Sequence, residues 1–286
     1  MTNILLLYRP KSDNAVLSWG NWRAGLPLAN LTDRRLSRVA RSTDTRLEST
    51  RLRVTLPQDE TFRTLVLGPM NVTSGFRYRV QRYAGAGFST VGYDSGWTKP
   101  FEGSAGGALS LEWENANFWL GIIPFDDDER GVYLIHQLPT DQTGQYWSFE
   151  IDDQNNPAGF VQIGRLFMPE TWSPSINYGY GENGLSFKDN SLRASTLSGS
   201  TEVWRRINPR VWRGAFPYLP ESEGFAEAYR FFRAAGYDGE VFIVPDPDEP
   251  SSLQQRSFMG TLTQMDPLSQ ASYGLVGTGF SIEEII

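Results

Sequence analysis

The stretch GFVQIGRLFMPETWSP, residues 159–174, marks the point at which the character of the chain changes. Its first half predicts a strand, in which residues 160, 162, 164 and 166 face one way and residues 161, 163, 165 and 167 face the other. Pro169 and Pro174 then interrupt the strand, because proline cannot donate a backbone N–H to a neighbouring strand. We interpret the stretch as the last strand of a first β-domain, residues 1–169, that runs directly into a second unit, residues 170–286.

Upstream of this boundary the chain consists of short segments with strand-like alternation, separated by turn-forming residues. Leu52, Val54 and Leu56 alternate with Arg51, Arg53 and Thr55, as in a half-buried strand. Similar segments are residues 4–8, 36–41, 64–67, 77–83, 109–113, 118–123, 132–137 and 147–151. No segment here has a helical period over more than two turns. Eight to ten short strands with turns between them predict an all-β sandwich.

The second unit is predicted to be a smaller β-rich (α+β) domain with one helix. Residues 221–235 carry acids in the first turn, Ser222 or Glu221 as a cap, and Gly236 as the stop. Residues 225, 228, 229, 232 and 235 are expected to face a sheet. Strands are expected at 241–244, 257–262 and 273–282, and the polar stretch 185–200 is expected to form either a hairpin or a long arm.

Composition excludes several classes of protein. With 40% hydrophobic and 13% aromatic residues the chain is globular rather than disordered. A net charge of -7 disfavours nucleic acid as a partner. The absence of cysteine excludes disulfides, thiol nucleophiles and thiolate metal sites. The first ten residues resemble neither a signal peptide nor a membrane span, so we expect a protein made in a cytosol without membrane insertion.

Arginine is concentrated in one segment. Residues 34–53 contain seven arginines opposed only by Asp44 and Glu48. Either these arginines pair with acids elsewhere in the chain, or they lie at a subunit contact. For the second alternative the candidate interface residues are Arg34, Arg35, Arg38 and Arg41.

No catalytic set, cofactor site or metal site is predicted. His136, the single histidine, lies in a strand-like segment and is interpreted as structural, and no Gly-x-Ser-x-Gly motif is present. The acidic run at residues 126–129 lacks the spacing of an EF-hand, and remains open as a solvated loop, a cation site or a partner for the arginines. We therefore expect no enzyme.

Aromatic residues in loops are the candidates for carbohydrate binding. A tryptophan or tyrosine ring can stack on the apolar C–H face of a sugar, although many such rings instead close the ends of β-sandwiches. The candidates are Trp19, Trp22, Tyr93 and Trp97.

The order of the segments at residues 25–33, 39–42, 65–73 and 78–80, with the closing stretch 147–167, resembles a discoidin-type, galactose-binding-like jelly roll. More narrowly it resembles the jelly-roll domains of tail proteins in long-tailed bacteriophages, over most of residues 15–168. The cysteine pair that often closes extracellular discoidin domains is absent, which disfavours an animal adhesion protein. The second unit, through residues 172–181, 213–216, 241–247 and 256–262, is similar to the ring-forming domain of distal tail proteins.

These resemblances imply a structural component of a bacteriophage tail tip or baseplate, forming part of a ring at the distal end of the tail tube. The implied partners are the tail tube, the hub, further baseplate subunits and other copies of the chain, and the implied location is the virion tail. The alternative is a carbohydrate-binding module that recognises a glycan on the host surface.

Overall fold

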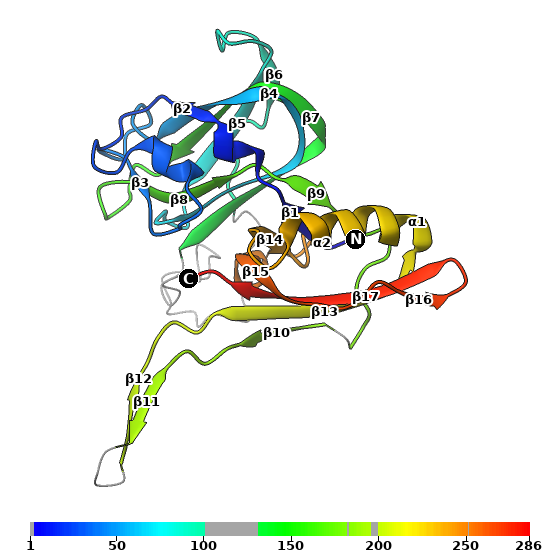
Figure 1. Ribbon diagram of the computed structural model, residues 1–286. Helices are drawn as coiled ribbons and strands as arrows, with labels where there is room; N and C mark the ends of the chain where they lie inside the picture. Colours follow the sequence, from blue (N-terminus) through cyan, green and yellow to red (C-terminus); the bar gives the residue numbers. More distant parts are fainter. Residues whose placement is uncertain (1–2, 101–130, 182, 196–199, 251) are drawn as a thin grey trace, which may run out of the picture. The chain divides into compact units, whose positions relative to one another are not determined.

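The computed structural model describes residues 3–100, 131–181, 183–195, 200–250 and 252–286. The chain divides into two compact units. One, the jelly-roll unit, comprises Pro10–Thr171 and Glu249–Gln255. The other, the arm unit, comprises Met1–Arg9, Trp172–Asp248 and Arg256–Ile286. The chain is mainly β in both units, which confirms the predicted fold class (Figure 1).

The jelly-roll unit is built around two long strands, β4 (Arg51–Met70) and β7 (Val132–Asp152), which pair along most of their lengths. The sheet order is β3-β8-β4-β7-β5-β6, and β2 pairs with β4. The remaining elements are β2 (Val16–Ser18), β3 (Ala40–Arg41), β5 (Arg77–Tyr83), β6 (Val91–Asp94), β8 (Gln162–Phe167) and the 3-10 helices η1 (Lys11–Asn14) and η2 (Leu28–Thr32). Several register shifts interrupt the β4–β7 pairing, and such irregularities bend strands.

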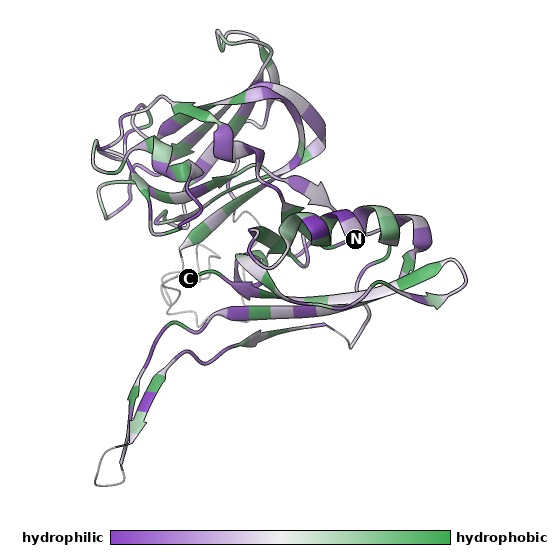
Figure 2. Cartoon of the chain, in the orientation of Figure 1, coloured by the Kyte–Doolittle hydropathy of each residue, from purple (hydrophilic) through white to green (hydrophobic). Residues whose placement is uncertain are grey.

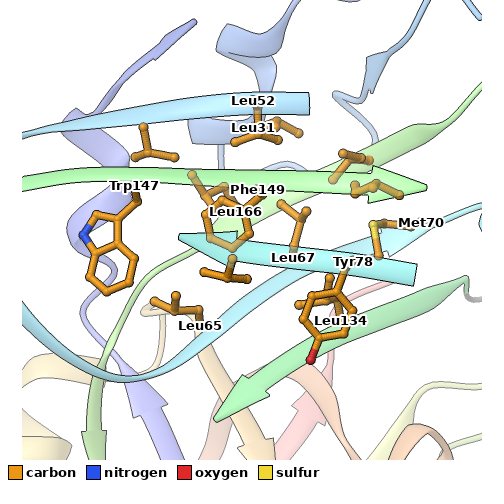
Figure 3. Close-up of a cluster of buried hydrophobic side chains, with 14 of the residues drawn as sticks. Leu31, Leu52, Leu65, Leu67, Met70, Tyr78, Leu134, Trp147, Phe149 and Leu166 are labelled. Carbon is orange, nitrogen blue, oxygen red and sulfur yellow. The ribbon is translucent and has the colours of Figure 1, made fainter. Parts of the chain in front are cut away.

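The core of the jelly-roll unit contains side chains from both ends of the curved β4–β7 pair. Leu52 and Phe149 come from one end of the β4–β7 pair, while Leu67 and Leu134 come from the other, and all four are buried in one cluster (Figure 3). Trp147 is fully buried, with its ring edge-on to Phe62 at 5.7 Å. The alternation in the sequence of β4 therefore supplies one apolar face to the core and one arginine-bearing face to the outside.

The boundary strand of the sequence, β8, is buried on both faces rather than one. Its residues Ile163 to Phe167 are all buried, and among them the charged side chain of Arg165 is fully buried. Arg165 donates to Asp13 Oδ1 at 2.5 Å and to the carbonyl of Leu31 at 3.3 Å, so η1 and η2 supply acceptors to its guanidinium.

The arm unit contains a sheet of order β10-β13-β17-β15-β14-β1-β9, with β16 paired to β17. Its strands are β1 (Leu5–Tyr8), β9 (Glu170–Trp172), β10 (Gly184–Phe187), β13 (Arg210–Pro220), β14 (Val241–Val244), β15 (Phe258–Met265), β16 (Ser269–Ser272) and β17 (Leu275–Glu284). A short helix, α3 (Leu253–Arg256), precedes β15, and all of it except Arg256 belongs to the jelly-roll unit. The predicted division at residue 169 placed residues 1–9 in the first unit. The structure groups them with the second unit, because β1 pairs with β14 along Leu5–Tyr8.

The predicted helix is present, but its buried face differs from the prediction. It runs as α1 (Glu221–Glu223), a π-helical segment η3 (Gly224–Ala228) and α2 (Tyr229–Ala235), and Gly236 follows with φ 51°. Neither Ser222 nor Glu221 caps it, because Pro220 is the N-cap. The buried residues are Gly224, Ala228, Phe231 and Ala235, while residues 225 and 229 are exposed. A π-helical turn holds more residues than an α-helical turn, so it displaces the face that a period of 3.6 predicts.

Between β10 and β13 the chain leaves the sheet as a hairpin. Its strands β11 (Leu192–Ser195) and β12 (Thr201–Trp204) pair only with each other among the described strands, and they extend away from β10 and β13 (Figure 1). We call residues 188–207 the arm. This stretch was expected to form either a hairpin or a long arm. The structure shows both features, because the hairpin itself extends away from the sheet as an arm.

Candidate functional site

Two of the four aromatic residues proposed for sugar stacking are held by the interior of the jelly-roll unit. The ring of Trp22 packs against the core cluster, and its Nε1 donates to the carbonyl of Arg51 at 3.4 Å. Tyr93 also packs against the core, and its hydroxyl lies 3.0 Å from His136 Nε2. These contacts are those of rings that close the end of a sandwich.

The other two aromatic residues contact arginine side chains at the surface. The ring centroid of Trp19 lies 4.2 Å from Arg51 Cζ and 4.5 Å from Arg53 Cζ. The ring of Trp97, which is 39% exposed, lies 5.5 Å from Arg77 Cζ. Cations at such distances over an aromatic face interact favourably with its π electrons. The structure thus pairs Trp19 with β4 and Trp97 with β5, and none of the contacts above joins the four predicted residues into one site.

His136 lies between two tyrosine hydroxyls. Its Nδ1 is 3.1 Å from the hydroxyl of Tyr78, and its Nε2 is 3.0 Å from that of Tyr93. A neutral imidazole offers one donor and one acceptor, so it satisfies both contacts without a charge. Burial lowers the pKa of His136 to about 4 and raises the pKa of Tyr78. This arrangement fits the structural role predicted for the histidine.

The lowered pKa gives a prediction about acid stability. Unfolded His136 would titrate near its ordinary pKa of 6.5, so between pH 6.5 and pH 4 the unfolded chain binds a proton that the folded chain does not. The contribution of His136 is therefore complete above pH 6.5 and is lost as the pH falls toward 4, by about 3 kcal/mol in total. Urea unfolding at several pH values should show that the free energy of unfolding of the wild type falls between pH 6.5 and pH 4, and that this fall is absent in His136→Gln. An equal dependence on pH in the two proteins would contradict the lowered pKa of His136.

The four arginines proposed for a subunit contact have different surroundings. Arg35 and Arg38 pair with Asp33 at 2.8 and 3.2 Å, and the hydrogen bonds from Arg35 hold the pKa of the Asp33 carboxyl well below its usual range. Arg41 donates to Gln162 and lies over the ring of Phe160 at 4.2 Å. Arg34 is exposed. Arg35 and Arg38 therefore pair with an acid, as the first of the two alternatives expects, although both remain more than half exposed. Arg41 instead has a glutamine and an aromatic ring as partners.

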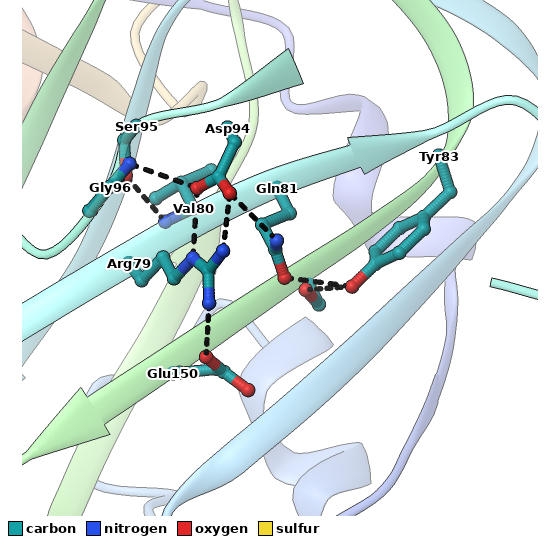
Figure 4. A network of polar contacts seen from close by, with 9 residues as sticks. Arg79, Val80, Gln81, Tyr83, Asp94, Ser95, Gly96 and Glu150 are labelled. Carbon is teal, nitrogen blue, oxygen red and sulfur yellow. Dashed lines mark hydrogen bonds and ion pairs between the residues drawn. The ribbon is translucent and has the colours of Figure 1, made fainter. Parts of the chain in front are cut away.

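A polar network covers the outer face of β5 and the neighbouring part of β7 (Figure 4). Arg79 binds both carboxylate oxygens of Asp94, donating from Nε at 2.8 Å, and lies 4.0 Å from Glu150. The hydrogen bond from Arg79 lowers the pKa of Asp94 to about 2. Gln81 also donates to Asp94, and Tyr83 donates to Gln81. These contacts connect β6 to β5, and two acids of this face, Asp94 and Glu150, contact Arg79.

Metal-ligating side chains do not cluster in the part of the chain that the structure describes. Within those residues no group of three histidine, cysteine, aspartate or glutamate side chains could hold a metal ion. The acidic run at 126–129 lies outside the described residues. Among the described helices, none has the length and apolar character needed to cross a membrane.

Exposed apolar side chains are concentrated in the arm unit. Of 17 large hydrophobic residues exposed in the described chain, 14 belong to the arm unit and three, Val16, Val91 and Trp97, to the jelly-roll unit. On the arm itself Leu192 and Trp204 are direct cross-strand partners, exposed by 50% and 53%, and hydrophobic residues occur on both of its strands (Figure 2). The sequence does not predict this clustering, because a short alternating segment does not reveal whether a sheet covers it.

No family model matches the chain, and no curated protein matches it. Similar solved structures include module CBM32-1 of a family 31 glycoside hydrolase from Clostridium perfringens, at 12% identity over 57% of this chain and 99% of that one, with a TM-score of 0.37. The family 32 module of NanJ from C. perfringens, in complex with galactose, is 11% identical over 58% and 99%, with a TM-score of 0.37. A serum f-lectin (fucolectin) from striped bass, Morone saxatilis, is 9% identical over 72% and 68%, with a TM-score of 0.36. At these scores the fold class rests on the strands described above.

Proposed function

We propose that the protein is a structural subunit of a larger protein assembly, in which the arm docks onto a neighbouring copy of the chain. The observation that carries this proposal is the arm itself. Every described residue from 188 to 207 is exposed except Ser191, which is half-buried. An isolated two-stranded hairpin is at best marginally stable in water. A neighbour that covers the arm would supply the contacts that its own sheet does not.

The apolar character of the arm supports a protein as the partner. Leu192 and Trp204 share one face of the hairpin, and Val203 lies on the other. Clusters of exposed apolar side chains of this kind commonly mark protein–protein contacts. Tryptophan is also enriched among the residues that contribute most to such contacts. A contact between the arm of one copy and a different face of the next is heterologous, and contacts of that kind generate rings when the rotation closes.

The resemblance of both halves of the sequence to tail proteins narrows the proposed assembly. We place the chain in a ring at the distal end of the tail tube of a long-tailed bacteriophage. Its partners there would be other copies of the chain, the tail tube, the hub and further baseplate subunits. The support for this narrower role is the sequence resemblance together with the exposed arm.

Sedimentation velocity of the purified full chain tests the assembly. We expect species larger than a monomer that become more abundant with concentration. The double variant Leu192→Ser, Trp204→Ser should weaken self-association at least about tenfold, because it removes the apolar cross-strand pair from the arm. Val16→Ser, which changes an exposed apolar residue of the jelly-roll unit, is the matched control and should leave association unchanged. A wild-type chain that stays monomeric at all concentrations would contradict docking between copies.

We propose a second role, glycan binding, for the jelly-roll unit. The observation that favours it is the exposed ring of Trp97 beside the guanidinium of Arg77, which also donates to Asp152. The ring offers an apolar face to a sugar, and the remaining N–H groups of Arg77 offer hydrogen-bond donors. A glycan array probed with the full chain should give saturable signals, and Trp97→Ala should reduce them. An array without signal for any glycan would overturn this second role and leave the assembly role untouched.

A further inference from the structure

Two neighbouring arginines lie on the outer face of β4. Arg51 and Arg53 alternate with the buried Leu52 and Val54, so both side chains leave the strand on the side opposite the core. In register, Arg53 lies opposite Ser148 of β7, and Arg51 lies opposite Glu150. Both arginines are half-buried. The sheet therefore presents two adjacent guanidinium groups on one face.

Aromatic rings flank these guanidinium groups. Trp19 contacts both arginines, at 4.2 and 4.5 Å from ring centroid to Cζ. The ring of Phe88 lies 4.4 Å from Arg53 Cζ, and it packs edge-on against Tyr83 at 5.1 Å. We call Trp19, Arg51, Arg53 and Phe88 the arginine–aromatic cluster. A ring stacked on a guanidinium restrains its plane and leaves the N–H groups at its edge as donors.

The backbone is strained at both aromatic residues of the cluster. Three described residues other than glycine have positive φ, and two of them are Trp19 at 87° and Phe88 at 51°. A bulky side chain rarely adopts this conformation, and such strain is concentrated at functional sites. Neither ring belongs to the buried core, since both are half-buried. The strain accompanies the placement of the two rings against the arginines.

Acids in the described residues do not pair with the arginines of the cluster. Within the described parts of the chain, no carboxylate lies within 4.0 Å of Arg51 or Arg53. The Nε atoms of both arginines are buried and lack a hydrogen-bond partner there. The neighbouring Arg79, in contrast, is bound by Asp94 and lies 4.0 Å from Glu150 (Figure 4). Glu150, the acid opposite Arg51, thus contacts Arg79 instead.

We propose that the arginine–aromatic cluster binds the carboxylate or sulfate of an acidic sugar. An arginine fork can donate two parallel N–H bonds to such an oxyanion, and restraint of its plane by aromatic rings reduces the entropy that binding must overcome. Adjacent aromatic rings also offer apolar surface to the C–H groups of a sugar ring. Two neighbouring arginines suit a single carboxylate or sulfate group on a sugar. This inference rests on the proposed glycan-binding role and specifies its ligand class.

Isothermal titration calorimetry with the full chain tests the inference. The probes are sialyllactose and trigalacturonate as carboxylated sugars, a sulfated lactose, and lactose as the neutral reference. We expect at least one acidic probe to bind about tenfold or more tightly than lactose, with an affinity that falls as salt is added. The carboxylated and sulfated probes distinguish the two sources of the oxyanion.

The variants identify the residues. Arg51→Gln combined with Arg53→Gln should abolish the preference for the acidic probe. Arg63→Gln, which removes an exposed arginine from the same strand, is the matched control and should keep it. If the double variant does not fold, Arg53→Lys serves instead, because it keeps the charge and loses the bidentate geometry, and the preference should still weaken. The inference would be overturned if lactose bound as tightly as every acidic probe, or if a folded variant kept the preference for the acidic probe. Either result would leave the glycan-binding role in place. If no glycan bound at all, both the inference and the glycan-binding role would be overturned.

Discussion

Arg165→Ala is expected to lower the free energy of unfolding of the jelly-roll unit by about 3–5 kcal/mol, because it leaves the partly buried carboxylate of Asp13 and the carbonyl of Leu31 without the donor that pairs with them. Arg165 is fully buried, and Asp13, which accepts its hydrogen bond at 2.5 Å, retains 26% exposure of its side chain. The loss also includes the packing of a long side chain in the middle of β8. Urea unfolding of the full chain, with hydrogen exchange in peptides of β4 and β8, measures the effect.

A double-mutant cycle separates the charge from the packing in this prediction. Arg165→Met keeps most of the volume and still leaves Asp13 unpaired, while Asp13→Asn removes the charge of the partner. The combined variant should be more stable than Arg165→Met alone, because it no longer contains the uncompensated carboxylate. A loss below about 1 kcal/mol for Arg165→Ala would show that the pair contributes little to the fold.

Trp147→Ala is expected to destabilise the same unit by a similar amount, about 3–5 kcal/mol, through a cavity in the core. Trp147 is fully buried, its ring contacts Phe62, and its Nε1 donates to the carbonyl of Gly144 at 3.0 Å. The measurement is again urea unfolding with hydrogen exchange in β4 and β7. Trp97→Ala, a change at an exposed ring, is the matched control and should alter stability by less than about 0.5 kcal/mol. Equal effects of the two changes would contradict the placement of the core.

The sequence predicted the positions of individual strands and the helix better than it predicted which strands pair with one another. The apolar run at 241–244 identified β14 within its observed bounds. The alternation of residues 51–56 identified only the first part of β4, which continues to Met70 and includes the segment 64–67 that was predicted as a separate strand. That β1 pairs with β14 is a contact between residues more than 230 positions apart, and no local pattern contains it. The π-helical segment η3 likewise depends on packing, since the buried Gly224 brings the backbone against Val276.

The candidate sites show the same division between local pattern and tertiary contact. The alternation of Arg51 and Arg53 with apolar residues was visible in the sequence, but the rings that flank them come from positions 19 and 88. In the sequence Arg165 lies among apolar residues of the boundary stretch, which indicates a buried charge. The sequence does not show that Asp13 is the partner of this charge. The hydroxyl of Tyr93, a residue proposed for sugar stacking, lies 3.0 Å from His136 Nε2, a contact between β6 and β7 that the sequence alone does not specify.

We propose that the arm unit assembles with copies of itself in a bacteriophage tail. Cryo-electron microscopy of phage particles that carry this chain tests it most directly. We expect density for the chain at a fixed, symmetric position at the distal end of the tail tube, with β11 and β12 of each copy covered by the adjacent copy. Absence of the chain from the particle, or an arm that projects into solvent in the assembled tail, would contradict the account.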